Sequence, residues 1–300
     1  MVATIKIKVK YLAIALMLLL NYNIKAQQSN PVYTQNTFKV LTYNVWEGFK
    51  GADSAKVAGF KDWIKTLSPD IIALQEMNKY TPVSLKKLAD EMGYSYSVIH
   101  KENGFPIALI SRFPIQNIKK VTTGMTHGFL YGKIKDYHVF VAHLDPKSYQ
   151  QRQIDVRRLL LSVDSVPASE KVMIMGDFNN MSPQDADDYN NDSKMSLVRS
   201  SERNHPETHV LNESGDIDYS AIKSVIDHGF TDSWKLLNSK YEISAPTKVR
   251  THKNYTRIDY IWVNKTLKTS CLKATIIKDD FTDYLSDHYP MYLILKNVLI

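Results

Sequence analysis

The sequence of 300 residues contains a single cysteine, no glycine-rich phosphate loop and no apolar run long enough to cross a membrane. The lone Cys271 excludes an intrachain disulfide, so the fold depends on a hydrophobic core, which a chain of this length can supply. The missing phosphate loop argues against a P-loop nucleotide-binding domain. The longest apolar run, Tyr11–Leu20, is about half of the ~20 residues that a membrane-spanning helix needs.

The first 26 residues have the pattern of a signal peptide. Lysines at positions 6, 8 and 10 precede the apolar run, and Ile24-Lys25-Ala26 places a small residue before a cleavage site near Ala26. We therefore expect a secreted or periplasmic protein without a transmembrane segment after cleavage. The alternatives are an uncleaved N-terminal anchor and a buried helix.

The basic charge of the chain comes largely from this segment. Residues 1–26 contain four lysines and no acidic residue, so the formal charge falls from +7 to +3 without them. A charge of this size gives little support to non-specific nucleic-acid binding, which needs clustered positive charge.

Residues 38–300 are expected to form one domain after a short flexible lead-in at residues 27–37. The sequence shows no internal repeat and no low-complexity linker, and its 44% hydrophobic and 23% charged residues are those of an ordinary globular protein. Strand-like and helix-like segments alternate without an interior break, which predicts a single α/β or α+β domain with mixed sheets. The polar residues 179–216 are expected to be the longest irregular region.

Apolar spacing predicts the individual elements. Short runs that are apolar throughout suit strands buried on both faces, and longer segments with apolar residues at helical intervals suit helices. Lys135-Asp136 is a plausible tight turn between two strands, and Thr81-Pro82 resembles a cap and a first-turn proline. The expected strands include Phe38–Val45, Ile71–Leu74, Tyr94–Ile99, Ile107–Ile110, Phe129–Ile134, Tyr137–Ala142, Val172–Met175, Arg257–Val263 and Tyr289–Leu295, and the expected helices include Asp53–Leu67, Thr81–Met92 and Gln150–Val163.

Polar side chains lie next to the ends of these apolar segments. A strand that leads into a loop holds such a side chain rigidly at the rim of a sheet, where functional sites are usually built. Each residue alone is weak evidence, because a glutamate after a strand is more often a loop residue or helix cap, and Gly176-Asp177-Phe178-Asn179 is also a turn pattern. The conjunction in one chain is the signal: Asn44, Glu76, His143, Asp177, Asn179, Asp259, Asp287 and His288.

These residue types are those that phosphoester hydrolysis needs. Hard oxygen ligands such as Glu76 and Asp287 suit Mg²⁺, which can polarise a phosphoryl oxygen and stabilise a leaving group. A carboxylate paired with a histidine can activate water as a general base. A second, protonated histidine and an amide can stabilise charge on the phosphoryl oxygens.

The same segments, taken in order, resemble the motif set of the endonuclease/exonuclease/phosphatase superfamily, the deoxyribonuclease I-like group. Its members include pancreatic-type deoxyribonucleases, AP endonucleases, bacterial sphingomyelinases and inositol polyphosphate 5-phosphatases. The resemblance covers about residues 38–295 and implies a four-layer α/β sandwich, in which two packed mixed β-sheets are flanked by helices and the site lies at one edge. The segments that carry it are TYNVW (42–46), LQE (74–76), HLD (143–145), GDFN (176–179), RIDYI (257–261) and SDH (286–288).

The resemblance implies a divalent metal site. Glu76 would be the main ligand, assisted by Asn44 and Asp287. Mg²⁺ is the expected ion, with Mn²⁺ or Ca²⁺ as alternatives. Some family members are described with two metals, which would recruit Asp177 and Asp287 differently.

The resemblance also implies the catalytic roles. Asp259 would orient His288, the candidate general base, and Asp177 would position the attacking water or the phosphate. Asn179 and His143 would hold phosphoryl oxygens. The division of roles between Asp177 and His288 stays open. A histidine at the position of His143 is typical of the nuclease, sphingomyelinase and phosphatase branches rather than of AP endonucleases.

Four further features have competing interpretations. Arg112 in Ser-Arg-Phe-Pro is a candidate phosphate contact, with a structural loop arginine as the alternative. His205 and His209 have the spacing of a helical metal pair but lie among irregular residues that favour a surface loop. Trp234 is expected in the core rather than as a stacking platform, and Cys271 is expected to be a buried, inert thiol.

The expected function is a secreted metal-dependent hydrolase of phosphoester bonds, foremost a phosphodiesterase, with water attack and His288 as general base. The substrate classes left open are nucleic acid, as for an extracellular nuclease, a phospholipid head group, as for a sphingomyelinase, and a small soluble ester. A binding module that has lost the chemistry is the minor alternative, and every expected catalytic residue is present. No stable protein partner is evident.

Overall fold

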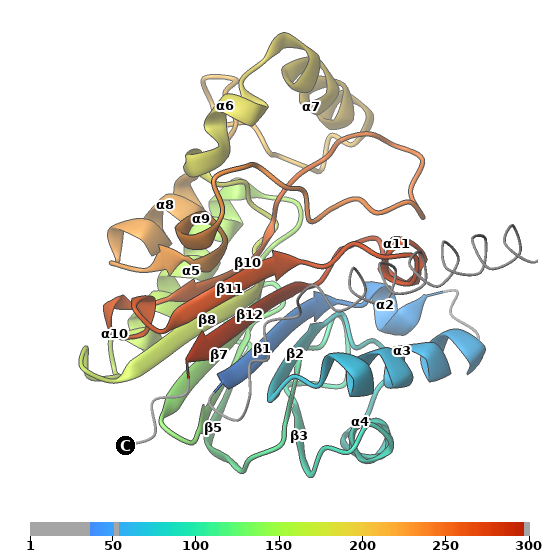
Figure 1. The fold of residues 1–300 in the computed structure, drawn as a ribbon. Coiled ribbons are helices and arrows are strands. Elements are labelled where there is room, and N and C mark those ends of the chain that lie inside the picture. Colours follow the sequence, from blue (N-terminus) through green and yellow to red (C-terminus); the bar gives the residue numbers. More distant parts are fainter. Residues whose placement is uncertain (1–36, 51–53, 297–300) are drawn as a thin grey trace, which may run out of the picture. The chain divides into compact units, whose positions relative to one another are not determined.

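Two mixed β-sheets of six strands each form the centre of the computed structural model, which describes residues 37–50 and 54–296 (Figure 1). Residues from Phe38 onward belong to one compact unit. The expected signal peptide lies outside the described residues, as do the lead-in up to residue 36 and the last four residues of the expected domain. None of the helices in the described ranges is long and apolar enough to cross a membrane.

The first sheet has the parallel strands β1 and β2 at its centre, with antiparallel strands on the side of β2 and at the other edge. Its strand order is β11 (Cys271–Ile276), β12 (Met291–Lys296), β1 (Thr37–Asn44), β2 (Ile71–Gln75), β4 (Ala108–Ser111) and β3 (Tyr96–Ile99). The second sheet is built in the same way around the parallel strands β7 and β8. Its order is β5 (Ile115–Val121), β6 (Phe129–Ile134), β7 (Tyr137–His143), β8 (Lys171–Asp177), β10 (Asp259–Val263) and β9 (Thr231–Asp232).

Alternate residues of the central strands point to opposite faces, and both faces are buried. Ala73 of β2 and Met175 of β8 belong to the core between the two sheets. Leu74 packs on the outer side of the first sheet under α3 (Ser54–Leu67) and α4 (Pro82–Glu91), whereas Ile174 packs on the outer side of the second sheet under α5 (Tyr149–Val163) and α8 (Ser220–Asp227). The two outer helix pairs are seen in Figure 1. The predicted four-layer sandwich of two mixed sheets flanked by helices is confirmed.

The remaining helices are short or lie in the long connection after β8. Residues 179–216 were expected to be irregular, and this expectation is wrong in part, because Asp192–Asn204 forms the helix α7. The side chain of Asn191 caps it by accepting from the Lys194 N–H, but Val198 is its only fully buried apolar residue, so the sequence carries little helical periodicity. The other short helices are α2 (Trp46–Phe49), η1 (Pro183–Asp185), α6 (Ala186–Tyr189), α9 (Ser233–Leu237), α10 (Lys265–Lys268) and α11 (Thr282–Leu285).

Candidate active site

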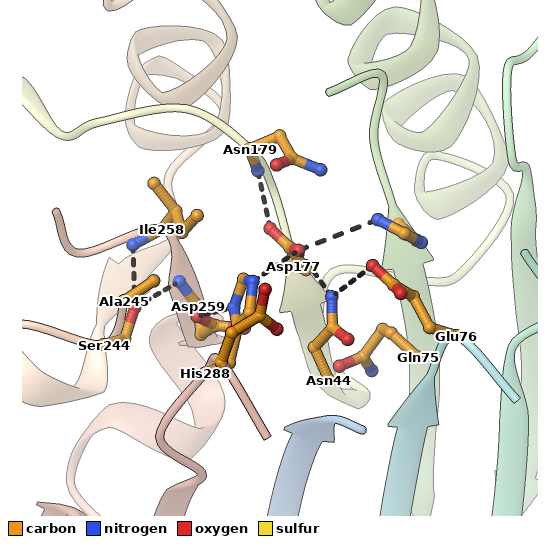
Figure 2. Close-up of polar contacts among 12 residues, drawn as sticks. Asn44, Gln75, Glu76, Asp177, Asn179, Ser244, Ala245, Ile258, Asp259 and His288 are labelled. Carbon is orange, nitrogen blue, oxygen red and sulfur yellow. Dashed lines mark hydrogen bonds and ion pairs between the residues drawn. The ribbon is translucent and has the colours of Figure 1, made fainter. Parts of the chain in front are cut away.

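The strand pairing brings the predicted residues to one edge of the sandwich. In the first sheet Asn44 lies opposite Gln75 at the ends of β1 and β2, and Glu76 follows directly. In the second sheet Asp177 lies between His143 of the parallel β7 and Asp259 of the antiparallel β10. Because parallel strands end at the same edge, these side chains meet where the carboxyl ends of four strands converge. Figure 2 shows Asn44 between Glu76 and Asp177, with Asp259 and His288 beside them.

Gly176 allows this convergence, since its φ is +135° and a Cβ there would lie 1.9 Å from the Ala142 carbonyl oxygen of the neighbouring strand. Only glycine fits a position that combines a left-handed φ with so close a backbone contact. The glycine of the Gly-Asp-Phe-Asn segment therefore lets β8 pair with β7 up to Asp177.

Asp177 is at the centre of the site. Its Oδ2 accepts a hydrogen bond from Asn44 Nδ2 at 2.9 Å, and its Oδ1 accepts one from the Asn179 backbone N–H at 2.8 Å. The Nε2 atoms of His143 and His288 lie 3.6 and 3.8 Å from Oδ2. Burial raises the pKa of Asp177 to about 7, against the lowering influence of His288. This carboxyl group can therefore gain or lose a proton near neutral pH.

His288 and Asp259 form a hydrogen-bonded pair. His288 Nδ1 lies 2.8 Å from Asp259 Oδ2, and Ser244 Oγ accepts from the backbone N–H of Asp259 and thereby fixes the start of β10. Burial alone would lower the pKa of His288, but the carboxylates of Asp259 and Asp177 outweigh it and raise that pKa well above its ordinary value. The predicted role of Asp259 in orienting His288 agrees with this geometry, in which Nε2 is left to face Asp177.

Glu76 and Asn44 are held by a strained turn. Trp46, Glu47, Gly48 and Phe49 in α2 all have positive φ, between 48° and 72°, and Glu76 itself has φ 61°. The turn directs the Glu47 N–H to Glu76 Oε2 at 2.8 Å, while Asn44 Nδ2 donates to Oε1 at 3.0 Å. Left-handed backbone costs about 1–2 kcal/mol per non-glycine residue. Strain of this kind persists where a site requires a particular geometry.

The charge balance of the site suits a divalent cation. Glu76, Asp177, Asp259 and Asp287 supply four carboxylates, and among the described residues Glu76 accepts hydrogen bonds only from neutral donors. Asp177, Asp259 and His288 also offer ligand atoms within 4.8 Å of one another. Since Asp259 and His288 already bond to each other, that group is better arranged for proton transfer, and Glu76 with Asn44 is the better fit for a hard cation.

His143 differs from the prediction of a protonated second histidine. Burial lowers its pKa well below the ordinary value, and the neighbouring His127 lowers it further, so the ring is neutral at neutral pH. Its ring centroid lies 4.3 Å from that of His127 and 6.3 Å from that of Phe105. A neutral imidazole can still donate one hydrogen bond to a phosphoryl oxygen, so His143 keeps a role as a donor without a charge.

Asp287 and Asn179 reach the site with other partners. Asp287 is paired with Arg250, whose Nη2 lies 2.6 Å from Asp287 Oδ2. Asn179 donates from its side-chain Nδ2 to the Leu144 carbonyl, directly after His143. Both residues lie on the same edge as Asp177 and His288.

The prediction that Arg112 contacts the phosphate is wrong. Arg112 follows β4, which runs antiparallel to β2, so it lies at the edge where β2 begins, opposite to Glu76. Its guanidinium donates to Ser68 Oγ and stacks on the Tyr94 ring at 4.6 Å. It therefore fixes a loop, which was the alternative interpretation.

The other candidates take structural positions. Trp234 is buried and its Nε1 donates to the Lys240 carbonyl, as expected for a core residue. Cys271 is only partly buried, but burial raises its pKa to about 11, which makes the thiol unreactive. His205 lies just beyond α7 and His209 in the following loop, so they do not form a helical metal pair.

The sequence interpretation missed three residues at the site. His127 and Phe105 form a wall beside His143, and Arg250 pairs with Asp287. The sequence contained a signal for His127. The predicted tight turn at Lys135-Asp136 pairs Ile134 with Tyr137, and the same register, followed to the other end of the hairpin, places His127 close to His143. Arg250 lies in a segment without periodicity, so no local pattern marked it.

A family model described as the Endonuclease/Exonuclease/phosphatase family matches residues 41–288. The chain belongs to this family. The match includes all the predicted site residues, from Asn44 to His288. Members of the family are metal-dependent phosphoester hydrolases, and this chain is a hydrolase of that kind.

The individual proteins that this chain resembles share less than a third of its residues in the aligned regions. The chain is 29% identical over 172 residues to the uncharacterized protein YbhP of Escherichia coli. The aligned region covers 48% of this chain and 68% of YbhP. It is similar in structure to an AP endonuclease from Archaeoglobus fulgidus, with a TM-score of 0.64 and 18% identity over 87% of this chain and 100% of the other. A 3′-5′ exonuclease from Neisseria meningitidis gives a TM-score of 0.66 and 18% identity over 86% and 100% of the two chains. At this identity the structural likenesses show the fold alone.

Proposed function

We propose that the chain is an exported phosphodiesterase that uses a divalent cation, with Mg²⁺ foremost, and in which His288 accepts a proton from the attacking water. The observation that carries this proposal is the position of Asp177 Oδ2, 3.8 Å from His288 Nε2 and 3.6 Å from His143 Nε2. A group that bridges Asp177 Oδ2 and His288 Nε2 would have to hydrogen bond to both atoms. A water molecule or a phosphoryl oxygen meets that requirement.

The protonation states support a division of labour. Asp177, with a pKa of about 7, and His288 hold a proton that either group can carry. With the proton on Asp177, its carboxyl group donates a hydrogen bond to a phosphoryl oxygen, and the neutral His288 Nε2 accepts the proton of water. The Asp259 carboxylate at Nδ1 then stabilises the imidazolium.

The remaining residues bind and orient the phosphate. His143 Nε2 and the Asn179 side chain offer neutral donors to phosphoryl oxygens. Glu76, Asn44 and, once it is released from Arg250, Asp287 would hold the cation. A cation bound there supplies Lewis-acid stabilisation of charge on the phosphoryl and leaving-group oxygens.

A nuclease is the second candidate. The structurally similar proteins described as an AP endonuclease and as a 3′-5′ exonuclease favour this substrate class. The small positive charge left after removal of residues 1–26 does not require it. A sphingomyelinase-like activity is less favoured, because the exposed large hydrophobic side chains of the described residues are scattered over separate elements rather than gathered on one strand hairpin for membrane docking.

Export is a further part of the proposal and rests on the pattern of residues 1–26. Expression of the full chain in a bacterial host tests it. We expect the protein in the periplasm or the medium, with an N-terminus after Ala26 by terminal sequencing. An intact N-terminus in the cytoplasm would contradict export without touching the catalytic proposal.

A hydrolysis panel tests the catalytic proposal. Bis-p-nitrophenyl phosphate, p-nitrophenyl phosphate, plasmid DNA, RNA and sphingomyelin are each incubated with Mg²⁺, Mn²⁺ or Ca²⁺ and with EDTA. We expect turnover of at least one diester, its abolition by EDTA, and a loss of at least ~100-fold in His288→Ala and Glu76→Ala. No turnover with any cation would contradict the proposal, and variants within about tenfold of wild type would contradict the site assignment.

A further inference from the structure

Arg250 lies beside the site, between the Asp287 carboxylate and the Trp46 ring. Its Nε and Nη2 both donate to Asp287 Oδ2, at 2.9 and 2.6 Å, and the centre of its guanidinium lies 4.5 Å from the Trp46 ring centroid. The Arg250 side chain is 41% exposed, whereas that of Asp287 is 14% exposed. A guanidinium that is stacked on one face and open to solvent keeps donors for a further acceptor.

The backbone around Arg250 is fixed by contacts that do not involve its side chain. Thr247 N donates to the Asp287 carbonyl at 3.1 Å, Thr247 Oγ1 donates to the Ser286 carbonyl, and the Arg250 N–H donates to the Thr247 carbonyl. The segment therefore stays on the Ser286-Asp287 backbone when the Arg250 side chain turns. The guanidinium can leave Asp287 without unfolding its loop.

Trp46 provides the surface on which it can turn. Trp46 belongs to the left-handed turn that also holds Glu76, and its backbone N–H donates to Asn44 Oδ1 at 3.0 Å. The backbone of Trp46 is thus fixed against the same two residues, Asn44 and Glu76, that suit the cation. A cation–π contact can hold the guanidinium on the ring after its second partner has changed.

The arrangement contains a competition for Asp287. A divalent cation that takes Asp287 as a ligand draws on the same negative charge as Arg250 and repels the guanidinium, which weakens the Asp287–Arg250 pair. The released guanidinium remains beside the site with paired N–H donors, a geometry that matches two oxygens of one phosphate.

We propose that Arg250 is a substrate-binding residue that exchanges the Asp287 carboxylate for oxygens of the substrate phosphate, while Trp46 holds its guanidinium plane. This inference rests on the proposed phosphoesterase function and assigns that site a phosphate clamp outside the motif residues. If this exchange takes place, Arg250 weakens cation binding in the free enzyme. Once the cation is bound, Arg250 strengthens substrate binding.

The two opposite effects define the test. Arg250→Gln is compared with wild type and with Arg250→Lys. Lys50→Gln is the matched control. The Lys50 ammonium also lies near the Trp46 ring, at 5.7 Å from its centroid, but it pairs with Glu47 rather than with Asp287. Mn²⁺ affinity is measured by electron paramagnetic resonance without substrate. Inorganic phosphate binding at saturating Mn²⁺ is measured by calorimetry, and kcat and KM are measured with whichever ester is hydrolysed.

We expect Arg250→Gln to bind Mn²⁺ more tightly than wild type, to bind phosphate at least about tenfold more weakly, and to raise KM more than it lowers kcat. Arg250→Lys should bind phosphate with intermediate affinity, because it keeps the charge but loses the fork and the stacking. Lys50→Gln should match wild type in all three measurements. Tryptophan fluorescence is also measured while phosphate is added. The part of the fluorescence change that is lost in Trp46→Phe comes from Trp46. We expect this part to be lost in Arg250→Gln as well.

Other results overturn the inference. If Arg250→Gln weakens both Mn²⁺ and phosphate binding together with its melting temperature, Arg250 only anchors its loop. If both affinities equal those of wild type, no exchange takes place. The binding measurements need no turnover. If wild type and Arg250→Gln bind Mn²⁺ and phosphate equally well, the exchange at Arg250 is disproved while the proposed function stands. A wild type that binds no Mn²⁺ disproves the proposed function together with it.

Discussion

At the scale of single residues, the site works through a contrast between two histidines. Both are buried and both face Asp177 Oδ2, yet their pKa values move in opposite directions. His288 has the Asp259 carboxylate at 2.8 Å, whereas His143 has the rings of His127 and Phe105. The same side chain is therefore a proton acceptor with a stabilised charge in one position and a neutral hydrogen-bond donor in the other.

This contrast predicts the effect of Asp259→Asn. The amide can still accept a hydrogen bond from His288 Nδ1, but it removes the charge that raises the pKa of His288. A base must be unprotonated to act, so the rate rises with pH through its pKa, and a lower pKa moves the acidic limb of the rate profile to lower pH. We expect kcat to fall at least ~100-fold and that limb to shift downward in a pH series. A profile at the wild-type position would show that Asp259 does not act through His288.

Within the elements, the site depends on backbone geometry that few residues permit. Gly176 and Gly215 both have a left-handed φ, of 135° and 79°, but a Cβ on Gly176 would meet the Ala142 carbonyl at 1.9 Å and one on Gly215 would meet nothing within 4 Å. The pair therefore separates conformational strain from steric conflict.

We expect Gly215→Ala to lower the free energy of unfolding by about 1–2 kcal/mol, the cost of left-handed backbone for alanine. Gly176→Ala should lower it by at least about 3 kcal/mol, because β7 and β8 must also separate. Urea unfolding of both variants measures this difference. Equal losses in the two variants would mean that the strand pair adjusts freely and that the Gly-Asp-Phe-Asn segment does not need its glycine for packing.

The elements also show which parts of the site a sequence can predict. Asn44, Glu76, Asp177 and His143 lie at or directly after the ends of strands that are apolar on both faces, and such strands are readily recognised. Arg112 was misplaced because its position depends on the direction of β4, which apolar periodicity does not encode. The helix α7 was missed because its cap and few apolar residues give a weak local signal.

At the scale of the whole molecule, packing buries several ionisable groups whose proton binding differs between the folded and unfolded states. Burial lowers the pKa of His100 and of His127 to about 4, and that of His143 also lies well below its ordinary value. Burial has the opposite effect on Asp177, whose pKa is raised to about 7. The pH dependence of stability follows from the balance of these groups.

Between about pH 6.5 and pH 4, the unfolded chain protonates the three histidines and the folded protein does not, while Asp177 is protonated only in the folded protein. Among these four groups the unfolded state therefore binds more protons, and their joint contribution to stability falls as the pH falls through this range. His288, with its raised pKa, is already protonated in the folded protein and gains its proton in the unfolded chain near pH 6.5, so it opposes this slope only at the upper end of the range.

We expect the urea midpoint in EDTA to be lower at about pH 5 than at about pH 7, and the drop to be smaller in His100→Gln by about 1 kcal/mol, which allows for partial solvent screening. His100 suits this test because it is 4% exposed and is not placed among the catalytic or metal-binding residues. His205→Gln, which replaces a histidine whose side chain is 65% exposed beyond α7, is the control and should keep the wild-type slope. Stability that rises on acidification, or a His100→Gln slope equal to that of wild type, would show that these buried histidines take up protons without opening the fold.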